Sequence, residues 1–171
     1  MVRISNKKII LISCLVLLIV AGLVTIPIII RNSQPIPSNL KKQIIFPVFY
    51  PSRSDVTVKR SSMKYDSSAQ VLSFIGYTTS GDAKLVFSEE PTPDPFNDVS
   101  GYYTAVLNNL NQYEDFNNVN GQTYLTRPKN LGGNESAVMS SKGTLMFIRT
   151  FTNLSTNQWT TIFNDLTIVV K

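Results

Sequence analysis

Histidine is absent from the 171-residue sequence, and cysteine occurs only once, at Cys14. Without histidine, the chain lacks the serine–histidine and cysteine–histidine pairs that activate nucleophiles, together with the most common general acid–base side chain. A single cysteine allows no internal disulfide and none of the usual cysteine and histidine sets that bind zinc. We therefore expect a protein that is not an enzyme, with no catalytic residues, no metal site and no cofactor.

Charged residues are also few, and basic and acidic residues are distributed unevenly along the chain. Seven basic residues and one acid lie between Arg31 and Lys64, whereas six basic and ten acidic residues lie between Tyr65 and Lys171. Nucleic-acid binding would need basic clusters interleaved with aromatic side chains on one face, so we expect no nucleic-acid partner. A basic segment beside a bilayer instead suits anionic head groups or wall polymers, although it also suits an ordinary solvated edge strand and linker.

The longest feature that is present is an uncharged apolar run over residues 9–30, in which Ser13 and Thr25 are the only polar side chains. At about 1.5 Å of rise per residue, a helix of this length is about 33 Å long, enough to cross a hydrocarbon core of about 30 Å. A cleaved signal peptide would have a shorter core and a small-residue cleavage site. A lipoprotein signal ending at Cys14 would leave most of the apolar run on the mature protein. We favour a single uncleaved transmembrane helix.

Positive charge next to this helix sets the expected orientation. Lys7 and Lys8 outweigh Arg31 close to the span, and long domains cross a membrane largely regardless of charge. We therefore expect a cytoplasmic stub over residues 1–8, a span over 9–30, a proline-stiffened linker over 31–42 and an extracytoplasmic domain over 43–171. The absence of cysteine from that domain favours a bacterial origin.

Alternating apolar residues and turn signals predict several strands in the outer domain. The segment 43–50 is interrupted by Pro47, which indicates an edge strand or a bulge. Turn signals at 80–82, 120–121 and 141–143 each separate two expected strands. Asn120-Gly121 is the strongest of these signals, because both central positions of its expected turn need positive φ. The expected strands cover residues 56–65, 71–78, 83–88, 116–119, 122–126, 136–140 and 144–151, with a possible short strand at 167–170.

Two segments have helical spacing. Residues 98–110 place five apolar side chains on one face, with Asp98 as the expected N-cap, and the proline-rich stretch 89–95 before them is expected to be a loop. Ser155 and Gln158 form a capping box before a second helix, whose expected buried face is Trp159, Ile162, Phe163 and Leu166. The predicted fold is α+β: an antiparallel sheet with two helices packed on one face, preceded by a single N-terminal transmembrane helix.

Chemistry without histidine has two candidates in this sequence. The S-x-x-K pattern of serine–lysine enzymes occurs at 61–64 and at 38–41, but the first match falls in an expected strand and the second in the linker, and no S-D-N or K-T-G element accompanies them. A glycosidase needs two carboxylates that face each other across a cleft. The available acids all lie at expected loops or element ends, where charged side chains usually meet water: Glu89, Glu90, Asp94, Glu114 and Asp115.

Several aromatic residues raise the possibility of a binding groove between sheet and helix, although core packing is the more common role. Tyr102 is the best candidate for exposure because it falls off the apolar face of its helix. The set comprises Phe46, Phe49, Tyr50, Tyr102, Tyr103, Tyr113 and Phe116.

The order of these segments resembles the extracytoplasmic domains of uncharacterised single-pass bacterial envelope proteins and is similar to the outer domains of some anti-sigma factors. The resemblance rests on residues 85–91 with Phe96, and on residues 121–125, 137–138, 143–148, 159–162 and 165–166. That family has no agreed activity to carry over. The eight residues before Ile9 are too few for the inner domain that an anti-sigma factor needs.

Together these features predict a membrane-anchored extracytoplasmic binding or scaffolding module of the cell envelope, whose partners are the membrane and an envelope protein or wall polymer. Two alternatives remain open. One is a small subunit of a membrane protein complex, and the other is a histidine-free envelope hydrolase.

Overall fold

The computed structural model describes residues 35–52, 55–127 and 135–170. The chain divides into two units, residues 1–35 and 36–171, and all of the described helices and strands belong to the second. The predicted stub and the predicted membrane span at residues 9–30 lie outside the described residues. Within the described ranges, no helix combines the length and the apolar character that crossing a membrane requires.

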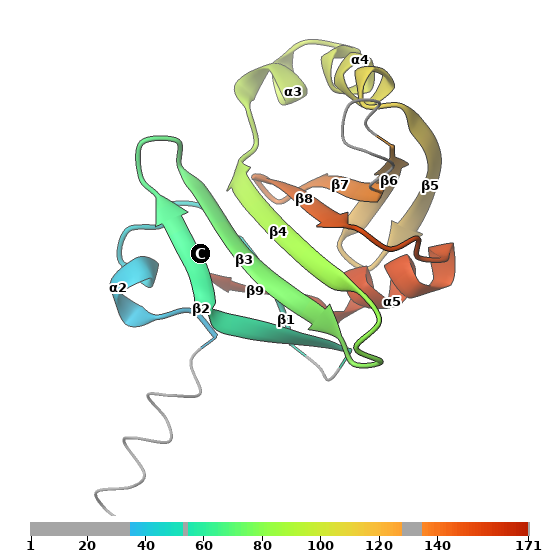
Figure 1. Ribbon diagram of the computed structural model, residues 1–171. Helices are drawn as coiled ribbons and strands as arrows, with labels where there is room; N and C mark the ends of the chain where they lie inside the picture. The colour runs from blue at the N-terminus through green and yellow to red at the C-terminus, as the bar shows by residue number, and fades with distance from the viewer. Residues whose placement is uncertain (1–34, 53–54, 128–134, 171) are drawn as a thin grey trace, which may run out of the picture. The chain divides into compact units, whose positions relative to one another are not determined.

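Seven strands form one antiparallel sheet in the order β2-β3-β4-β8-β7-β6-β5 (Figure 1). The first three and the last four are consecutive hairpin-linked strands, and the two groups join where β4 pairs with β8. The bounds are β2 Val56–Asp66, β3 Val71–Thr78, β4 Lys84–Pro91, β5 Gln112–Asn118, β6 Gly121–Thr126, β7 Glu135–Ser141 and β8 Thr144–Thr150.

One face of this sheet, the inner face, carries the main core. Because side chains alternate along a strand, Leu72 and Phe74 point inward from β3 while Ser73 between them points outward. Helix α5 (Thr156–Asp165) and a two-stranded sheet of β1 (Val48–Pro51) and β9 (Leu166–Val170) pack against the inner face. Trp159 and Phe163 of α5 are fully buried there, as the apolar spacing predicts.

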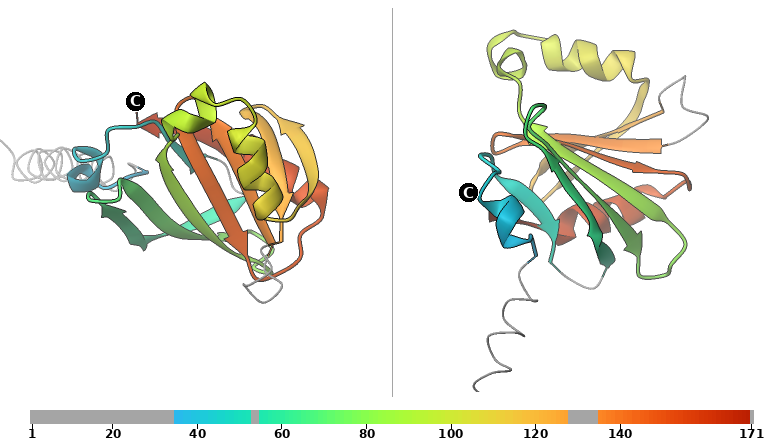
Figure 2. Two further views of the ribbon diagram at one scale, coloured as in Figure 1. Left: turned by 90° about the horizontal axis from the view of Figure 1, so that it is seen from above. Right: turned by 60° about the vertical axis from the view of Figure 1, so that its left-hand side comes forward.

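The opposite, outer face is only partly covered. The chain must cross β8, β7 and β6 to pass from β4 to the edge strand β5, and α3 (Asp94–Asp98) and α4 (Tyr102–Asn109) form this crossover. Leu107 of α4 packs on Val138 of β7 and Leu145 of β8 in a second, smaller apolar cluster. Figure 2 shows α4 and α5 on opposite sides of the sheet, while β2, β3 and β4 have no helix over their outer face.

The predicted α+β fold is therefore wrong in two respects. The described part of the chain is mostly β, with nine strands in two antiparallel sheets and four short helices. The helices expected on one face lie on opposite faces, because the β4–β5 connection crosses the outer face and the β8–β9 connection crosses the inner one. The predicted transmembrane helix in that fold falls outside the described residues.

Two element boundaries differ from the prediction for identifiable reasons. The expected helix at 98–110 is split, because Gly101 adopts φ 78° between α3 and α4, and Asp98 ends α3 instead of capping a helix. The expected loop at 89–95 begins later, because Glu89, Glu90 and Pro91 extend β4 and pair with β8.

The three hairpins are confirmed, but the turn chemistry differs at the strongest signal. Asn118 pairs with Gly121, so Val119 and Asn120 are the central residues, and neither has positive φ. The Asn120 side chain instead donates hydrogen bonds to the Phe163 and Leu166 carbonyl oxygens at the end of α5. Asn120 is thus used to cap a helix and not to form a left-handed turn.

The folded unit also begins earlier than the predicted domain start at residue 43. Ile36 is buried in the main core, and a four-residue helix, α2 (Ser38–Lys41), lies within the segment predicted as linker. At the other end of the chain, the capping box of Ser155 and Gln158 before α5 is confirmed in both of its hydrogen bonds.

Candidate functional site

A pocket of about 410 Å³ opens on the outer face, between the uncovered strands and the end of the α3–α4 crossover. Its lining comes from β3, β4, β8, β7 and β6, together with Leu110 just after α4. The crossover covers β6, β7 and β8 and does not reach β3. The pocket lies at the edge of the crossover, where the covered part of the outer face meets the uncovered part. This volume falls in the usual range for sites that hold small organic molecules.

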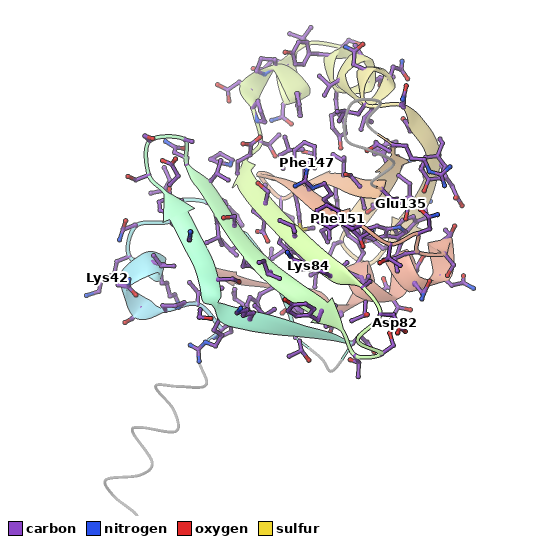
Figure 3. The ribbon with its side chains drawn as sticks, in the orientation of Figure 1. Lys42, Asp82, Lys84, Glu135, Phe147 and Phe151 are labelled. Atoms are coloured by element: carbon purple, nitrogen blue, oxygen red, sulfur yellow. The ribbon has the colours of Figure 1, made fainter. Side chains whose placement is uncertain are left out.

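The apolar part of the pocket is formed by Val86 on β4, Phe147 on β8 and Leu110. Leu110 and Phe147 also pack on the second apolar cluster, so their positions are fixed by the crossover. Figure 3 shows Phe147 on β8 beneath α3 and α4. These half-buried side chains offer a wall and floor for a nonpolar group.

The polar part consists of four hydroxyl groups and one cation. Ser73 and Ser88 face each other across β3 and β4, while Ser136 and Thr126 face each other across β7 and β6. Arg149 of β8 lies between Val86 and Ser136 in the same cross-strand row. No acidic side chain is found among the described residues that line the pocket.

Arg149 lies beside an aromatic ring and not beside an acid among the described residues. Its guanidinium carbon lies 5.5 Å from the ring centroid of Phe151, and Lys84 approaches the same ring at 6.0 Å. Figure 3 shows Lys84 and Phe151 near each other at this part of the sheet. Among the described residues, the one ion pair joins Arg127 to Glu135, so Arg149 has no carboxylate partner there.

Three lysines lie around the pocket on the outer face, which also carries Glu90 of β4. Lys59 and Lys64 of β2 pair with Ile75 and Ser73, and Lys84 of β4 pairs with Tyr77, which places all three cations on the same face as Arg149. All three lysines are exposed. The positive segment between residues 31 and 64 therefore contributes in part to an open sheet face and not only to a linker.

The acids considered for hydrolysis do not meet as a group. Glu89 points to the inner face and Glu90 to the outer one, Glu114 accepts a hydrogen bond from Thr156, and Asp115 accepts one from Gln122. Glu90 does share a shallow outer hollow with Asp94 of α3. Burial raises the pKa of Glu90 from its ordinary value.

Glu89 is fully buried on the inner face, a position that its place in an expected loop did not suggest. The Phe49 backbone N–H donates to its Oε2 over 2.9 Å, and its Oε1 has no hydrogen-bond partner among the described residues. Burial raises the pKa of this carboxyl group well above its ordinary value. Burial therefore favours the protonated form of Glu89, and its hydrogen bond with the Phe49 N–H tethers β1 to β4.

Sequence reasoning missed a second buried glutamate, Glu135, at the start of β7. Its carboxylate accepts hydrogen bonds from the Leu154 backbone N–H over 3.0 Å, from Trp159 Nε1 over 2.9 Å and from the Tyr113 hydroxyl. Arg127 lies 3.8 Å away and stacks on the Tyr113 ring. This cluster joins three strands to the start of α5, so its role is structural.

Neither S-x-x-K match forms a serine–lysine pair of the expected kind. Ser61 and Lys64 are both exposed on β2, as the strand prediction implies. The intervening Ser62 fills a β-bulge, since its hydroxyl accepts from the Ile75 N–H. Ser38 and Lys41 occupy the four-residue helix α2 on the surface and not a linker.

The aromatic residues proposed for a groove are dispersed. Phe46 and Phe49 are buried in the main core, and Tyr50 and Phe116 pack at its margin against Phe74 and Phe163. Tyr103 packs on the second cluster. The expected exposure of Tyr102 is confirmed at 45%, and Tyr113 is 41% exposed on the far edge strand.

For metals, no group of three or more candidate ligands comes together within the described ranges. The sequence matches no family model, and comparison with curated proteins and with solved structures gave no match.

Proposed function

We propose that this chain is a membrane-anchored, extracytoplasmic module of the cell envelope that binds a small component of its surroundings. The observation that carries the binding role is the outer-face pocket, which combines apolar walls, hydroxyl groups and a cation to which the described residues offer no acidic partner. Such a combination recognises a ligand and offers no pair of groups for acid–base chemistry.

The anchoring role rests on the apolar run at residues 9–30 and on the positive charge that precedes it. The folded unit begins at residue 36, so few residues separate the proposed anchor from the domain. A domain tied this closely to a bilayer would bind ligands that are present at the membrane surface or in the adjacent wall.

Cysteine labelling tests the anchoring and the orientation. In a Cys14→Ser background, Ser61→Cys places one thiol on the exposed surface of β2. We expect a membrane-impermeant maleimide to label this thiol in intact protoplasts, and we expect the chain to stay in the membrane through an alkaline carbonate wash. A matched variant with Leu17→Arg and Leu18→Arg should be lost from the washed membranes. Labelling that requires lysis of the protoplasts would contradict the proposal.

The shared hollow of Glu90 and Asp94 is the one observation that favours a hydrolase instead. That alternative predicts that the full chain releases soluble fragments from purified cell wall, and that Glu90→Gln with Asp94→Asn abolishes the release. We expect no release from either chain. Release by the unsubstituted chain alone would favour the hydrolase.

A further inference from the structure

We propose that the outer-face pocket binds a small amphipathic anion, with Arg149 as the partner of the negative charge and with Val86, Phe147 and Leu110 contacting the nonpolar body. This inference rests on the proposed binding function and names its ligand class. The free carboxylate of a short apolar peptide and that of a short fatty acid share this chemistry.

The charge of the pocket determines the sign of the ligand. Arg149 is half-buried and lines the pocket, and the described residues offer it no carboxylate. A guanidinium group presents paired N–H donors that match a carboxylate, and such charge-assisted hydrogen bonds are stronger than neutral ones. Three exposed lysines of the same face, Lys59, Lys64 and Lys84, attract an anion, and Glu90 at the far end of β4 opposes them in part.

The position of Arg149 is also prepared before a ligand arrives. Its guanidinium group stacks near the Phe151 ring, which reduces the side-chain freedom that binding would otherwise remove. The Ser136 hydroxyl, directly across from Arg149 on β7, supplies a further hydrogen-bond donor for a second oxygen atom.

The size and the apolar lining determine the rest of the ligand. A bare inorganic anion would leave the apolar part of an approximately 410 Å³ pocket unfilled. A neutral apolar molecule would displace some of the water around the Arg149 guanidinium group and would offer that group no hydrogen-bond acceptor in return. A single negative charge on a compact nonpolar body satisfies both regions.

The chain offers a matched control for the charge. Lys84 approaches the same Phe151 ring from β4 and carries the same charge as Arg149, but it does not line the pocket. An effect of the general positive field would appear in Lys84→Gln and Arg149→Gln alike. An effect of direct contact would appear only in Arg149→Gln.

Protection of a pocket thiol from alkylation measures binding to the full chain in nanodiscs of phosphatidylcholine. In the Cys14→Ser background, Ser88→Cys places the thiol in the pocket, and Ser61→Cys places it on β2 outside the pocket. The probes are 4-phenylbutyrate and its neutral amide, acetyl-Gly-Leu-Phe with a free C-terminus and its amide, and octanoate. Comparison of the peptide with octanoate identifies the source of the carboxylate.

We expect the carboxylates to slow alkylation at position 88 and not at position 61, and the amides to need at least about tenfold higher concentration. Arg149→Gln should weaken carboxylate protection by at least about tenfold, Arg149→Lys by less, and Lys84→Gln by less than about twofold. An unchanged fluorescence spectrum of Trp159, which is fully buried in the main core, shows that each variant is folded.

Equal protection by carboxylates and amides, protection that does not depend on Arg149, or no protection by any probe would overturn this inference. None of these results would alter the labelling of Ser61→Cys in protoplasts, so failure of the ligand class is distinguishable from failure of the proposed anchoring.

Discussion

Two glutamates are buried on the inner face of the same sheet, in opposite chemical surroundings. Glu135 is 2% exposed and its oxygens accept three hydrogen bonds, with Arg127 beside them. Glu89 is 0% exposed and accepts one backbone hydrogen bond, with one oxygen unpaired among the described residues. A buried acid can therefore be accommodated either by surrounding it with donors or by leaving its proton on.

The largest expected effect comes from removing the acid that is surrounded by donors. Glu135→Ala leaves the Trp159 indole, the Leu154 N–H and the Arg127 guanidinium without their shared acceptor, so we expect a loss of about 3–5 kcal/mol in the free energy of unfolding. Urea unfolding followed by the fluorescence of Trp159, the one tryptophan, measures this. Glu114→Ala, at an exposed position on β5, is the control and should cost less than about 1 kcal/mol.

The second effect concerns Glu89, the buried acid with a single hydrogen-bond donor among the described residues. The raised pKa of Glu89 means that the folded state holds this proton more tightly than the unfolded state does. Its contribution to stability is complete below the ordinary value of 4.5 and is lost as the pH rises above it. Each tenfold difference in proton affinity corresponds to about 1.4 kcal/mol.

Glu89→Gln removes this titration while keeping the shape of the side chain. We expect the variant to be more stable than the parent at pH 7, equal to it at pH 4, and to show a flatter dependence of unfolding free energy on pH. Equal slopes in variant and parent would mean that the folded state does not hold the Glu89 proton more tightly than the unfolded state does.

A smaller effect should follow from removing one donor to Glu135. Tyr113→Phe deletes the hydroxyl that donates to this carboxylate and keeps the ring that stacks on Arg127. We expect a loss of about 1.5 kcal/mol, because two other donors remain. The same substitution at Tyr102, exposed on α4, should change the unfolding free energy by less than about 0.5 kcal/mol.

The smallest effect should come from the charged neighbour. The Arg127 side chain is 56% exposed and its guanidinium nitrogen lies 3.8 Å from Glu135, so Arg127→Gln should cost less than about 1 kcal/mol. The difference from the parent should shrink further in 1 M salt. A cost equal to that of Glu135→Ala would mean that the ion pair, and not the hydrogen bonds, holds this end of the sheet.

Local patterns in the sequence predicted the hairpins and α5 well. Alternation fixed which residues of β3 point inward, and Ser155 and Gln158 marked the start of α5, because these signals depend on neighbours within a few residues. The error at Asn120 has the opposite cause. Its side chain donates hydrogen bonds to carbonyl oxygens at the end of α5, more than forty residues away. No local pattern in the sequence indicates these long-range hydrogen bonds.

The arrangement of the layers and the site required information that the sequence does not carry locally. The pairing of β4 with β8 sends one crossover over each face, and this pairing separates the two helices expected together. The pocket draws Ser73, Val86, Thr126 and Arg149 from four different strands. Each of these residues is unremarkable in its own segment, so only the assembled sheet brings them together.

The pairing of β1 with β9 has a mechanical consequence. Val48, where the chain enters this ladder, faces Val170, where it leaves, so both ends of the path emerge at the same end of the two strands. A pulling force applied between Val48 and Val170 would break the hydrogen bonds of this pair one after another, starting at these two residues, and not all at once. The seven-stranded sheet would stay intact while the two short strands came apart, which gives the domain a weak point for pulling that is separate from its strongest part.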